Sequence, residues 1–290
     1  MIRRSQIEWA QRLTGTFLIL YFLLLPGLLS AGIFRWQEPD GHTHYGDQPP
    51  EGAHDLRELH IPTVDGYSRI AAVIDGDTVE LGDGRRVRLL GINTPEVAHH
   101  GRPGEALGEK AKGFLERQLK NKKVRLRYDI ERRDRYDRLL AHIFLEDGRN
   151  INAMLLQKGL AHALFKWPNI KHIDNYYTLE RRARQQGKGI WALPAYRIRP
   201  MENLLSLRNR FVRLRGTVDV VEHKRRYSYL TFRNRLRVAV DQSRLPLFEE
   251  AGIELDALPG KKITLRGWLR QRDGSPFLKL EHPYQLERQD

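Results

Sequence analysis

One stretch decides the fold of this chain: residues 75–96, with the sequence DGDTVELGDGRRVRLLGINTPE. The stretch predicts a β-hairpin, with a first strand over residues 78–81, a glycine-containing turn at residues 82–84 and a returning strand over residues 86–90. The returning strand alternates arginine with valine or leucine, so one face is expected to be basic and the other apolar.

Carboxylates flank this hairpin at both ends. Asp75 and Asp77 precede it, and Glu96 follows it. Because a hairpin brings its ends together, we expect Asp77, Arg88 and Glu96 to share one site. Hard oxygen ligands beside a guanidinium suit a divalent cation and a phosphodiester. A solvated hairpin with a glycine-rich turn is the alternative that these residues alone leave open.

Positive charge is concentrated in two segments of the chain. The formal net charge of the 290 residues is +14. Residues 67–196 carry +9 and residues 205–290 carry +7, whereas residues 1–66 carry −3. Two basic segments of domain size indicate a phosphate-rich partner. The absence of cysteine excludes disulfides, thiolate zinc sites and a cysteine nucleophile.

The chain begins with the pattern of a secretory signal peptide. Arginines in residues 1–12 are followed by an uncharged apolar run over residues 13–34, with a break at Pro26-Gly27 and small residues near Ala31. The run is also long enough to span a bilayer. We therefore expect export to the periplasm or secretion. Residues 1–31 are then a cleaved signal peptide, which the break favours, or a retained inner-membrane anchor.

Residues 32–65 predict a small aromatic module and a linker. Residues 33–50 are expected to form a hairpin that turns at Pro39-Asp40-Gly41, and residues 51–65 are interpreted as the linker. The hairpin resembles a short module of unknown function that often follows signal peptides in bacterial envelope proteins. Its His42 and His44 have no third metal ligand, so they are interpreted as surface residues.

Residues 66–194 predict a β-barrel with helices. Strands are expected over residues 70–74, 78–81, 86–90, 124–128 and 139–145, and helices over residues 105–119, 150–158 and 175–186. Short strands around a closed core, with a few helices, are consistent with an OB-fold. The predicted fold class is therefore mainly β with helices, a β-barrel of the α+β type.

Four ordered motifs in this segment carry a family resemblance. They are DGDTV at residues 75–79, VRLLGINTPE at residues 87–96, DRYDR at residues 134–138 and GIW at residues 189–191. With these motifs, residues 67–193 resemble the staphylococcal nuclease, or thermonuclease, family. Members are calcium-dependent phosphodiesterases that cleave DNA and RNA and leave 3′-phosphate ends. The resemblance implies the same endonuclease activity here, with Ca²⁺ as cofactor and little sequence preference.

The resemblance also implies roles for individual residues. Arg88 and Arg138 match the catalytic arginines that grip the phosphate, and Glu96 matches the residue that orients or deprotonates the attacking water. The implied metal ligands are the side chains of Asp77 and Asn93 and the backbone carbonyl of Thr94, with Asp75 as a supporting partner.

Four residues match positions that contact the nucleotide. Arg135 and Tyr136 match residues at its terminal phosphate. Phe165 and Trp167 lie where the family places tyrosines beside the base, and stacking there would tolerate any base. A purely structural role for these two aromatic residues is the alternative.

Two residues depart from the family pattern. Asn93 replaces a carboxylate, so the implied calcium site loses one formal charge. Asp137 replaces the glycine that usually precedes the second arginine. If this position requires a positive φ, aspartate tolerates it better than most residues.

Residues 205–290 predict a second, OB-like barrel after a linker at residues 194–200. Strands are expected over residues 210–218, 227–232, 236–240, 261–269 and 277–280, with a short helix over residues 247–251. The strands combine basic and aromatic residues, namely Arg213, Arg215, Arg233, Arg235, Arg237, Tyr227, Tyr229 and Phe232. Such a surface suits single-stranded nucleic acid. A barrel that only packs on the nuclease is the alternative.

These observations favour an exported, calcium-dependent nuclease that acts on DNA and RNA. The alternative is a catalytically weak, nuclease-like protein of the cell envelope that only binds nucleic acid. The chain keeps the implied catalytic residues and the aspartate at position 77, which favours the enzyme. A purely structural envelope protein is disfavoured by the two basic segments.

Overall fold

The computed structural model of the chain describes residues 33–37, 43–46, 50, 53–59, 66–99, 101, 103–233 and 236–287. The chain divides into two compact units, Met1–His60 and Ile61–Asp290. The predicted signal or anchor segment, residues 1–31, lies outside the described residues. In the described parts, no helix combines the length and the apolar character needed to cross a membrane.

The first unit contains a three-stranded antiparallel sheet in the order β2-β1-β3. The predicted hairpin is confirmed as β1 (Ile33–Gln37) and β2 (Thr43–Gly46), where buried Trp36 stacks on His44 with ring centroids 5.7 Å apart. The prediction of a linker throughout residues 51–65 is wrong, because β3 (His54–Leu59) pairs with β1.

The second unit begins with a closed five-stranded barrel. Its strands are β4 (Tyr67–Asp75), β5 (Thr78–Leu81), β6 (Arg86–Leu89), β8 (Lys123–Arg127) and β9 (Leu139–Leu145). They close in the order β4-β5-β6-β9-β8, and every neighbouring pair is antiparallel except β6 and β9. This is the predicted OB-fold barrel. Its interior is filled by alternating apolar residues such as Val79, Val87 and Ile143, all fully buried.

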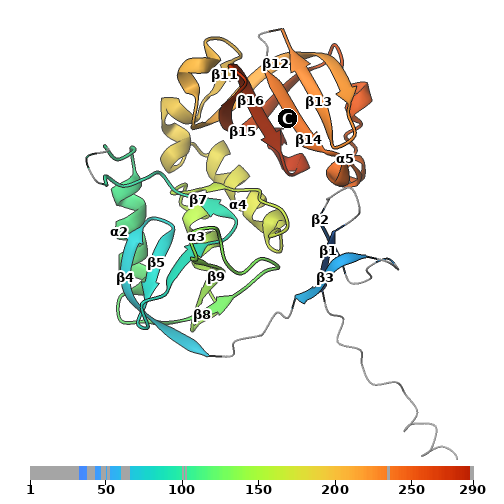
Figure 1. Cartoon of the computed structure of the whole chain (residues 1–290). Coiled ribbons are helices and arrows are strands. Elements are labelled where there is room, and N and C mark those ends of the chain that lie inside the picture. Colours follow the sequence, from blue (N-terminus) through green and yellow to red (C-terminus); the bar gives the residue numbers. More distant parts are fainter. Residues whose placement is uncertain are drawn as a thin grey trace, which may run out of the picture. The chain divides into compact units, whose positions relative to one another are not determined.

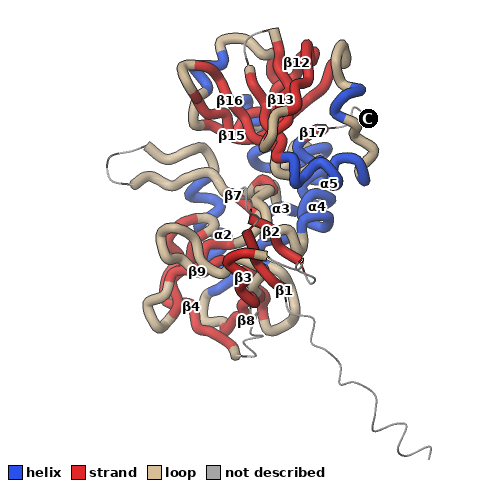
Figure 2. The backbone as a smooth tube through the Cα atoms, turned by 45° about the vertical axis from the view of Figure 1, so that its right-hand side comes forward, coloured by secondary structure: helices blue, strands red, loops and turns tan. Residues whose placement is uncertain are grey.

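Three helices cover this first barrel: α2 (Gly108–Leu119), α3 (Ile151–Gln157) and α4 (Ile173–Gln185). The α2 helix buries an apolar stripe that includes Leu115 and Leu119 in the barrel core. Figures 1 and 2 show α4 on the side of the first barrel that faces the second barrel.

The second barrel repeats the topology of the first. Its strands are β12 (Arg210–His223), β13 (Tyr227–Phe232), β14 (Arg237–Asp241), β15 (Lys262–Arg272) and β16 (Ser275–Leu280). They close in the order β12-β13-β14-β16-β15, again with one parallel pair, β14 and β16. The short helix α5 (Leu245–Glu250) lies between the third and fourth strands in sequence, as α2 does in the first barrel. The chain is thus a mixed α+β protein with two five-stranded barrels.

Short strands extend both barrels at their edges. In the first, β7 (Ile92–Asn93) pairs with β10 (His162–Ala163). In the second, β11 (Ile198–Pro200) runs parallel to β12, and β17 (Leu286–Glu287) pairs with β15. The prediction that residues 194–200 are only a linker is therefore wrong.

A buried ion pair joins the two barrels. Arg266 of β15 donates to both carboxylate oxygens of Glu180 on α4, and to the backbone oxygen of Ala163 at 3.2 Å. Arg266 and Glu180 are both fully buried. A buried charge is tolerated when it is paired and hydrogen-bonded, so each barrel depends on the other to neutralise this pair.

A second cluster of charges and a stacked pair of rings extend this contact. Glu287 of β17 accepts from Arg213 at 2.5 and 2.7 Å and from Arg184 of α4 at 3.1 Å. The rings of Tyr177 and Tyr284 stack with centroids 4.1 Å apart. The second barrel therefore packs on the first through a built interface.

Candidate active site

The β5–β6 hairpin sets the relative position of Asp77 and Arg88. Thr78 lies opposite Arg88 in the strand register, so Asp77 faces the guanidinium. Arg88 Nη2 lies 2.9 Å from Asp77 Oδ2, and the two side chains are only 13% and 7% exposed. Thr94 N donates to the same carboxylate oxygen at 3.0 Å. The predicted meeting of the two hairpin ends is confirmed.

Backbone carbonyls hold the Arg88 side chain in place. Its Nη1 donates to Leu89 O at 3.0 Å and to Ile92 O at 3.1 Å, and its Nη2 donates to Asn93 Oδ1 at 2.9 Å. Gly91 makes the turn between these carbonyls at a φ of +71°, where a Cβ would lie 2.9 Å from the ring of Tyr176. The chain thus presents a guanidinium of fixed position.

Glu96 completes a group of acidic side chains beside Arg88. Partial burial, a hydrogen bond with Asp75 and the negative charges of Asp75 and Asp77 together raise the pKa of Glu96 to about 7, against the opposing effect of Arg88. The Glu96 residue is exposed as a whole, so its carboxyl group is reachable from solvent. Three carboxylates and one guanidinium therefore share this site.

Glu105, which no sequence motif marks, fixes the backbone at Glu96. Glu96 N donates to Glu105 Oε2 at 3.2 Å, and Glu105 N donates to Glu96 O at 2.8 Å. No local pattern announces this pair, because it joins two ends of the loop before α2.

The loop at residues 134–138 positions Arg138. Asp134 accepts from Arg138 Nε at 2.8 Å, and it also accepts from the backbone amides of Tyr136 and Arg138. Asp137 has a φ of +62°, so the position does require the left-handed conformation, which glycine and aspartate tolerate better than most residues. Arg88 and Arg138 line one cavity of about 180 Å³.

Arg135 and Tyr136 lie at the tip of the same loop. Tyr136 is 64% exposed, and its hydroxyl accepts from Arg135 Nη2 at 2.6 Å. The guanidinium carbons of Arg135 and Arg138 lie 4.7 and 5.5 Å from the centre of its ring. An exposed aromatic ring therefore lies next to two guanidinium groups, one of which, Arg138, lines the cavity.

The second barrel covers the two residues expected beside the base. Phe165 is buried, and its ring stacks on His282 at a centroid distance of 5.5 Å. The guanidinium carbon of Arg244 lies 4.2 Å from the centre of the Trp167 ring. Phe165 has no open face for a base, so the structural alternative holds for it. Trp167 is half-buried beneath Arg244.

Some of the arginines on the strands of the second barrel contact other residues of the protein. Arg213 is used by Glu287, and Arg215 Nε donates to Thr264 Oγ1 at 2.9 Å. Arg237 lies over the ring of Tyr229, 4.4 Å from its centre. Arg235 lies outside the described residues. Several of these arginines are therefore engaged within the protein, and binding of single-stranded nucleic acid by these strands stays a prediction.

Comparison with known proteins agrees with this geometry. Residues 86–193 match the family model described as staphylococcal nuclease homologue. The thermonuclease of Staphylococcus hyicus is 37% identical over 128 residues, which are 43% of this chain and 75% of that protein. The chain belongs to the staphylococcal nuclease family. Its relatives include nucleic-acid hydrolases. Arg88 and Asn93 lie in the region that matches the family model, and Asp77 lies before it.

Other matches extend this assignment. The endonuclease YncB of Bacillus subtilis is 34% identical over 128 residues, 42% of this chain and 60% of that protein. An uncharacterized protein of Methanocaldococcus jannaschii is 30% identical over 205 residues, 62% of this chain and 96% of that protein. Residues 20–62 match a domain of unknown function, the module expected from the N-terminal sequence.

The family implies a calcium ion, and the oxygen donors near Arg88 suit one. Within the described residues, no three side chains of the His, Cys, Asp and Glu types are placed to hold an ion together. The candidate donors are the Asp77 carboxylate, the Asn93 amide oxygen and the Thr94 carbonyl oxygen, each of which already accepts a hydrogen bond within the chain. Thr94 Oγ1 is also buried there without a hydrogen-bond partner. These donors fit a hard cation, with neutral oxygens supplying most of the ligands.

Proposed function

We propose that this nuclease is an active, calcium-dependent endonuclease that hydrolyses phosphodiester bonds of DNA and RNA with little sequence preference. The observation that best supports this proposal is the shared cavity of Arg88 and Arg138, with the carboxylates of Asp77 and Glu96 beside Arg88. Two guanidinium groups on one cavity match the bidentate binding of a phosphate group.

In the proposed reaction, a water oxygen attacks the phosphorus and transfers its proton to the Glu96 carboxylate. Arg88 and Arg138 donate hydrogen bonds to the phosphate oxygens, whose negative charge grows as the new bond forms. The bond between phosphorus and the 5′ oxygen then breaks, and the 5′ oxygen leaves with the bonding electrons and takes a proton from solvent. The products are a 3′-phosphate end and a 5′-hydroxyl end.

Calcium, when bound, would polarise a phosphate oxygen and favour ionisation of the attacking water. The residues that would hold it are Asp77, Asn93 and Thr94. In the structure, Arg88 engages Asp77 Oδ2 and Asn93 Oδ1. A phosphate that draws the guanidinium towards itself would release both oxygens, so we expect ion and substrate to bind better together than alone.

We also propose that the protein acts outside the cytoplasm. The support is the N-terminal sequence, with its arginines, apolar run and small-residue site. Cell fractionation of the tagged protein would show whether it lies in the periplasm, the medium or the inner membrane. The mass of the recovered chain would show whether residues 1–31 have been cleaved.

The test is cleavage by the purified protein of supercoiled plasmid, single-stranded DNA and RNA, in calcium and in chelator. We expect degradation of all three in calcium only, and products that a polymerase extends only after phosphatase treatment. An Arg88→Ala sample purified in parallel excludes a contaminating nuclease. Binding without cleavage in calcium would overturn the proposal and support the binding-only alternative.

A further inference from the structure

A cleft between the two barrels adjoins the active site. Its volume is about 470 Å³, within the range of ligand-binding pockets. Asn93, Glu105 and His162 of the first barrel line it, and so do residues of the second barrel and of the connecting segment. Asn93 also accepts a hydrogen bond from Arg88 at 2.9 Å. Asn93 therefore lies both on the wall of the cleft and in contact with the candidate catalytic residue Arg88.

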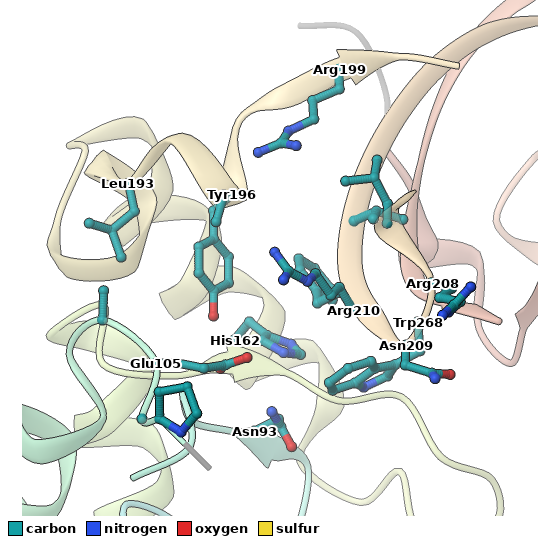
Figure 3. A pocket seen from close by; sticks show the side chains of 17 residues that line it. Asn93, Glu105, His162, Leu193, Tyr196, Arg199, Arg208, Asn209, Arg210 and Trp268 are labelled. Carbon is teal, nitrogen blue, oxygen red and sulfur yellow. The ribbon is translucent and has the colours of Figure 1, made fainter. Parts of the chain in front are cut away.

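The far side of the cleft is basic. Arg199, Arg208 and Arg210 line it, and Figure 3 shows Arg199 and Arg210 directed into the same space. Across the described chain, none of these three arginines forms an ion pair, and Arg199 has only the carbonyl oxygen of Pro194 as a hydrogen-bond acceptor. Uncompensated guanidinium groups in a cleft favour an anionic ligand.

The lining acid offsets only part of this charge. Glu105 is the acidic residue among those that line the cleft, so one carboxylate stands against three guanidinium groups. The arginines inside the barrel interface differ, because Arg213 and Arg266 are paired with Glu287 and Glu180. The cleft arginines, by contrast, have no carboxylate partner among the described residues.

Aromatic side chains form the wall beside these arginines. Trp268 and Phe211 are half-buried and lie opposite one another in the register of β15 and β12. Phe211 stacks on His162 with centroids 4.0 Å apart, whereas no aromatic ring of the described residues stacks on Trp268. Arginines beside an aromatic ring are typical of sites that bind single-stranded nucleic acid through phosphate contacts and base stacking.

The geometry points to a binding site for a single-stranded stretch of the substrate, which leaves the active site past Asn93 and enters the inter-barrel cleft. This inference rests on the proposed nuclease function. Arg199 and Arg210 would contact its phosphates, and Trp268 would stack a base. The volume accommodates about one or two nucleotides of a single strand but no duplex. The cleft would therefore favour single-stranded substrates over duplex DNA.

The test measures binding of a fluorescein-labelled 12-nucleotide oligothymidylate to the full protein by anisotropy, in chelator to prevent cleavage. In Arg199→Ala/Arg210→Ala, we expect affinity to fall on the order of tenfold. We also expect the slope of log affinity against log salt to fall by about 1.4, for the loss of two contacts to a single strand. A duplex of the same length should show a much smaller loss.

The matched control is Arg225→Ala/Arg272→Ala, which removes the same formal charge from exposed arginines of the second barrel outside the cleft. Equal effects of the two double variants, or no effect of the cleft variant, would overturn the inference. Cleavage of a dinucleotide tests the active site alone, so it distinguishes failure of the cleft inference from failure of the proposed nuclease function. If the wild-type protein cleaves in calcium but the cleft variant binds oligothymidylate normally, the binding role of the cleft is refuted and the nuclease function is not. A wild-type protein that never cleaves refutes the nuclease function, while the binding comparison still decides the cleft.

Discussion

Arg88 is the residue on which the candidate site depends most. Its guanidinium contacts an acid, an amide and two backbone carbonyls, so its position is fixed before substrate arrives. A charge held ready for the transition state avoids the cost of reorganisation during the reaction.

We expect Arg88→Ala to lower kcat by about 100- to 1,000-fold, because the growing phosphate charge loses a fixed donor. Arg86→Ala is the control, since Arg86 lies on the same strand but its side chain is 60% exposed. Arg86→Ala should leave kcat unchanged. Circular dichroism should show that both variants keep the barrel. An Arg88→Ala enzyme with nearly full activity would remove Arg88 from the mechanism.

Asn93 determines the charge of the implied calcium site. Asn93→Asp restores a carboxylate, so we expect calcium to bind about tenfold more tightly and activity to saturate at lower calcium. Asn209→Asp is the control, because it adds the same charge to the lining of the inter-barrel cleft. Calorimetric titration of each protein with calcium, with and without a nucleotide, measures this affinity. If calcium dependence is the same in all three proteins, Asn93 is not a ligand.

Contacts between residues close in sequence could be predicted from the sequence. The burial of a residue by a distant part of the chain could not. The meeting of Asp77 with Arg88 follows from a short hairpin whose register is local. The burial of Phe165 depends on His282, which lies more than a hundred residues later in the chain. No pattern around Phe165 announces such a partner.

At the scale of elements, alternation predicted the barrel strands well. The strands β9 and β13 match their expected bounds, because both alternate or run apolar over their whole length. The short strands β3 and β11 were missed, because pairing with β1 and β12 rather than their own composition makes them strands.

The turn from β16 to β17 contains His282, and protonation of this side chain disfavours its packing at the interface between the two barrels. Burial lowers the pKa of His282 to about 4, although Asp174 acts to raise it. Its Nδ1 accepts from Tyr284 N at 3.3 Å, which requires an unprotonated nitrogen. Its ring also stacks on Phe165. The neutral form is therefore the one that the barrel interface accommodates.

We expect this histidine to make the protein less stable in mild acid. The unfolded chain binds the proton near the ordinary pKa of 6.5 and the folded chain only near 4, so stability is lost as the pH falls through this interval. The loss should be on the order of 1 to 3 kcal/mol. His282→Asn keeps a side-chain acceptor without the titration. Urea unfolding of both proteins at pH 7 and pH 4.5 is the measurement, and equal losses would contradict the assignment.

At the scale of the whole molecule, the second barrel completes the first. Glu180 of α4 is fully buried, and its cationic partners are Arg266 and Arg184. Ala163 N also donates to Glu180 Oε2 at 2.5 Å, which ties the ion pair to β10. Asn93 of the active site lies opposite His162 on that same strand pair. The interface and the candidate active site therefore share one element.

Arg266→Met tests this dependence directly. It leaves Glu180 buried with less compensating charge, so we expect unfolding free energy to fall by about 3 to 5 kcal/mol. Arg272→Met on the same strand is the control, because that side chain is 63% exposed. It should change stability by less than about 0.5 kcal/mol.

The double variant Arg266→Met/Glu180→Gln separates lost charge balance from lost packing. Removal of both charges should restore much of the stability, because the penalty of Arg266→Met arises chiefly from the unpaired carboxylate. Urea unfolding and the rate of plasmid cleavage are measured in parallel, since a displaced β10 would also disturb Asn93. If Arg266→Met is as mild as Arg272→Met in both measurements, the two barrels fold and act independently, and the second barrel is no part of the nuclease's structural support.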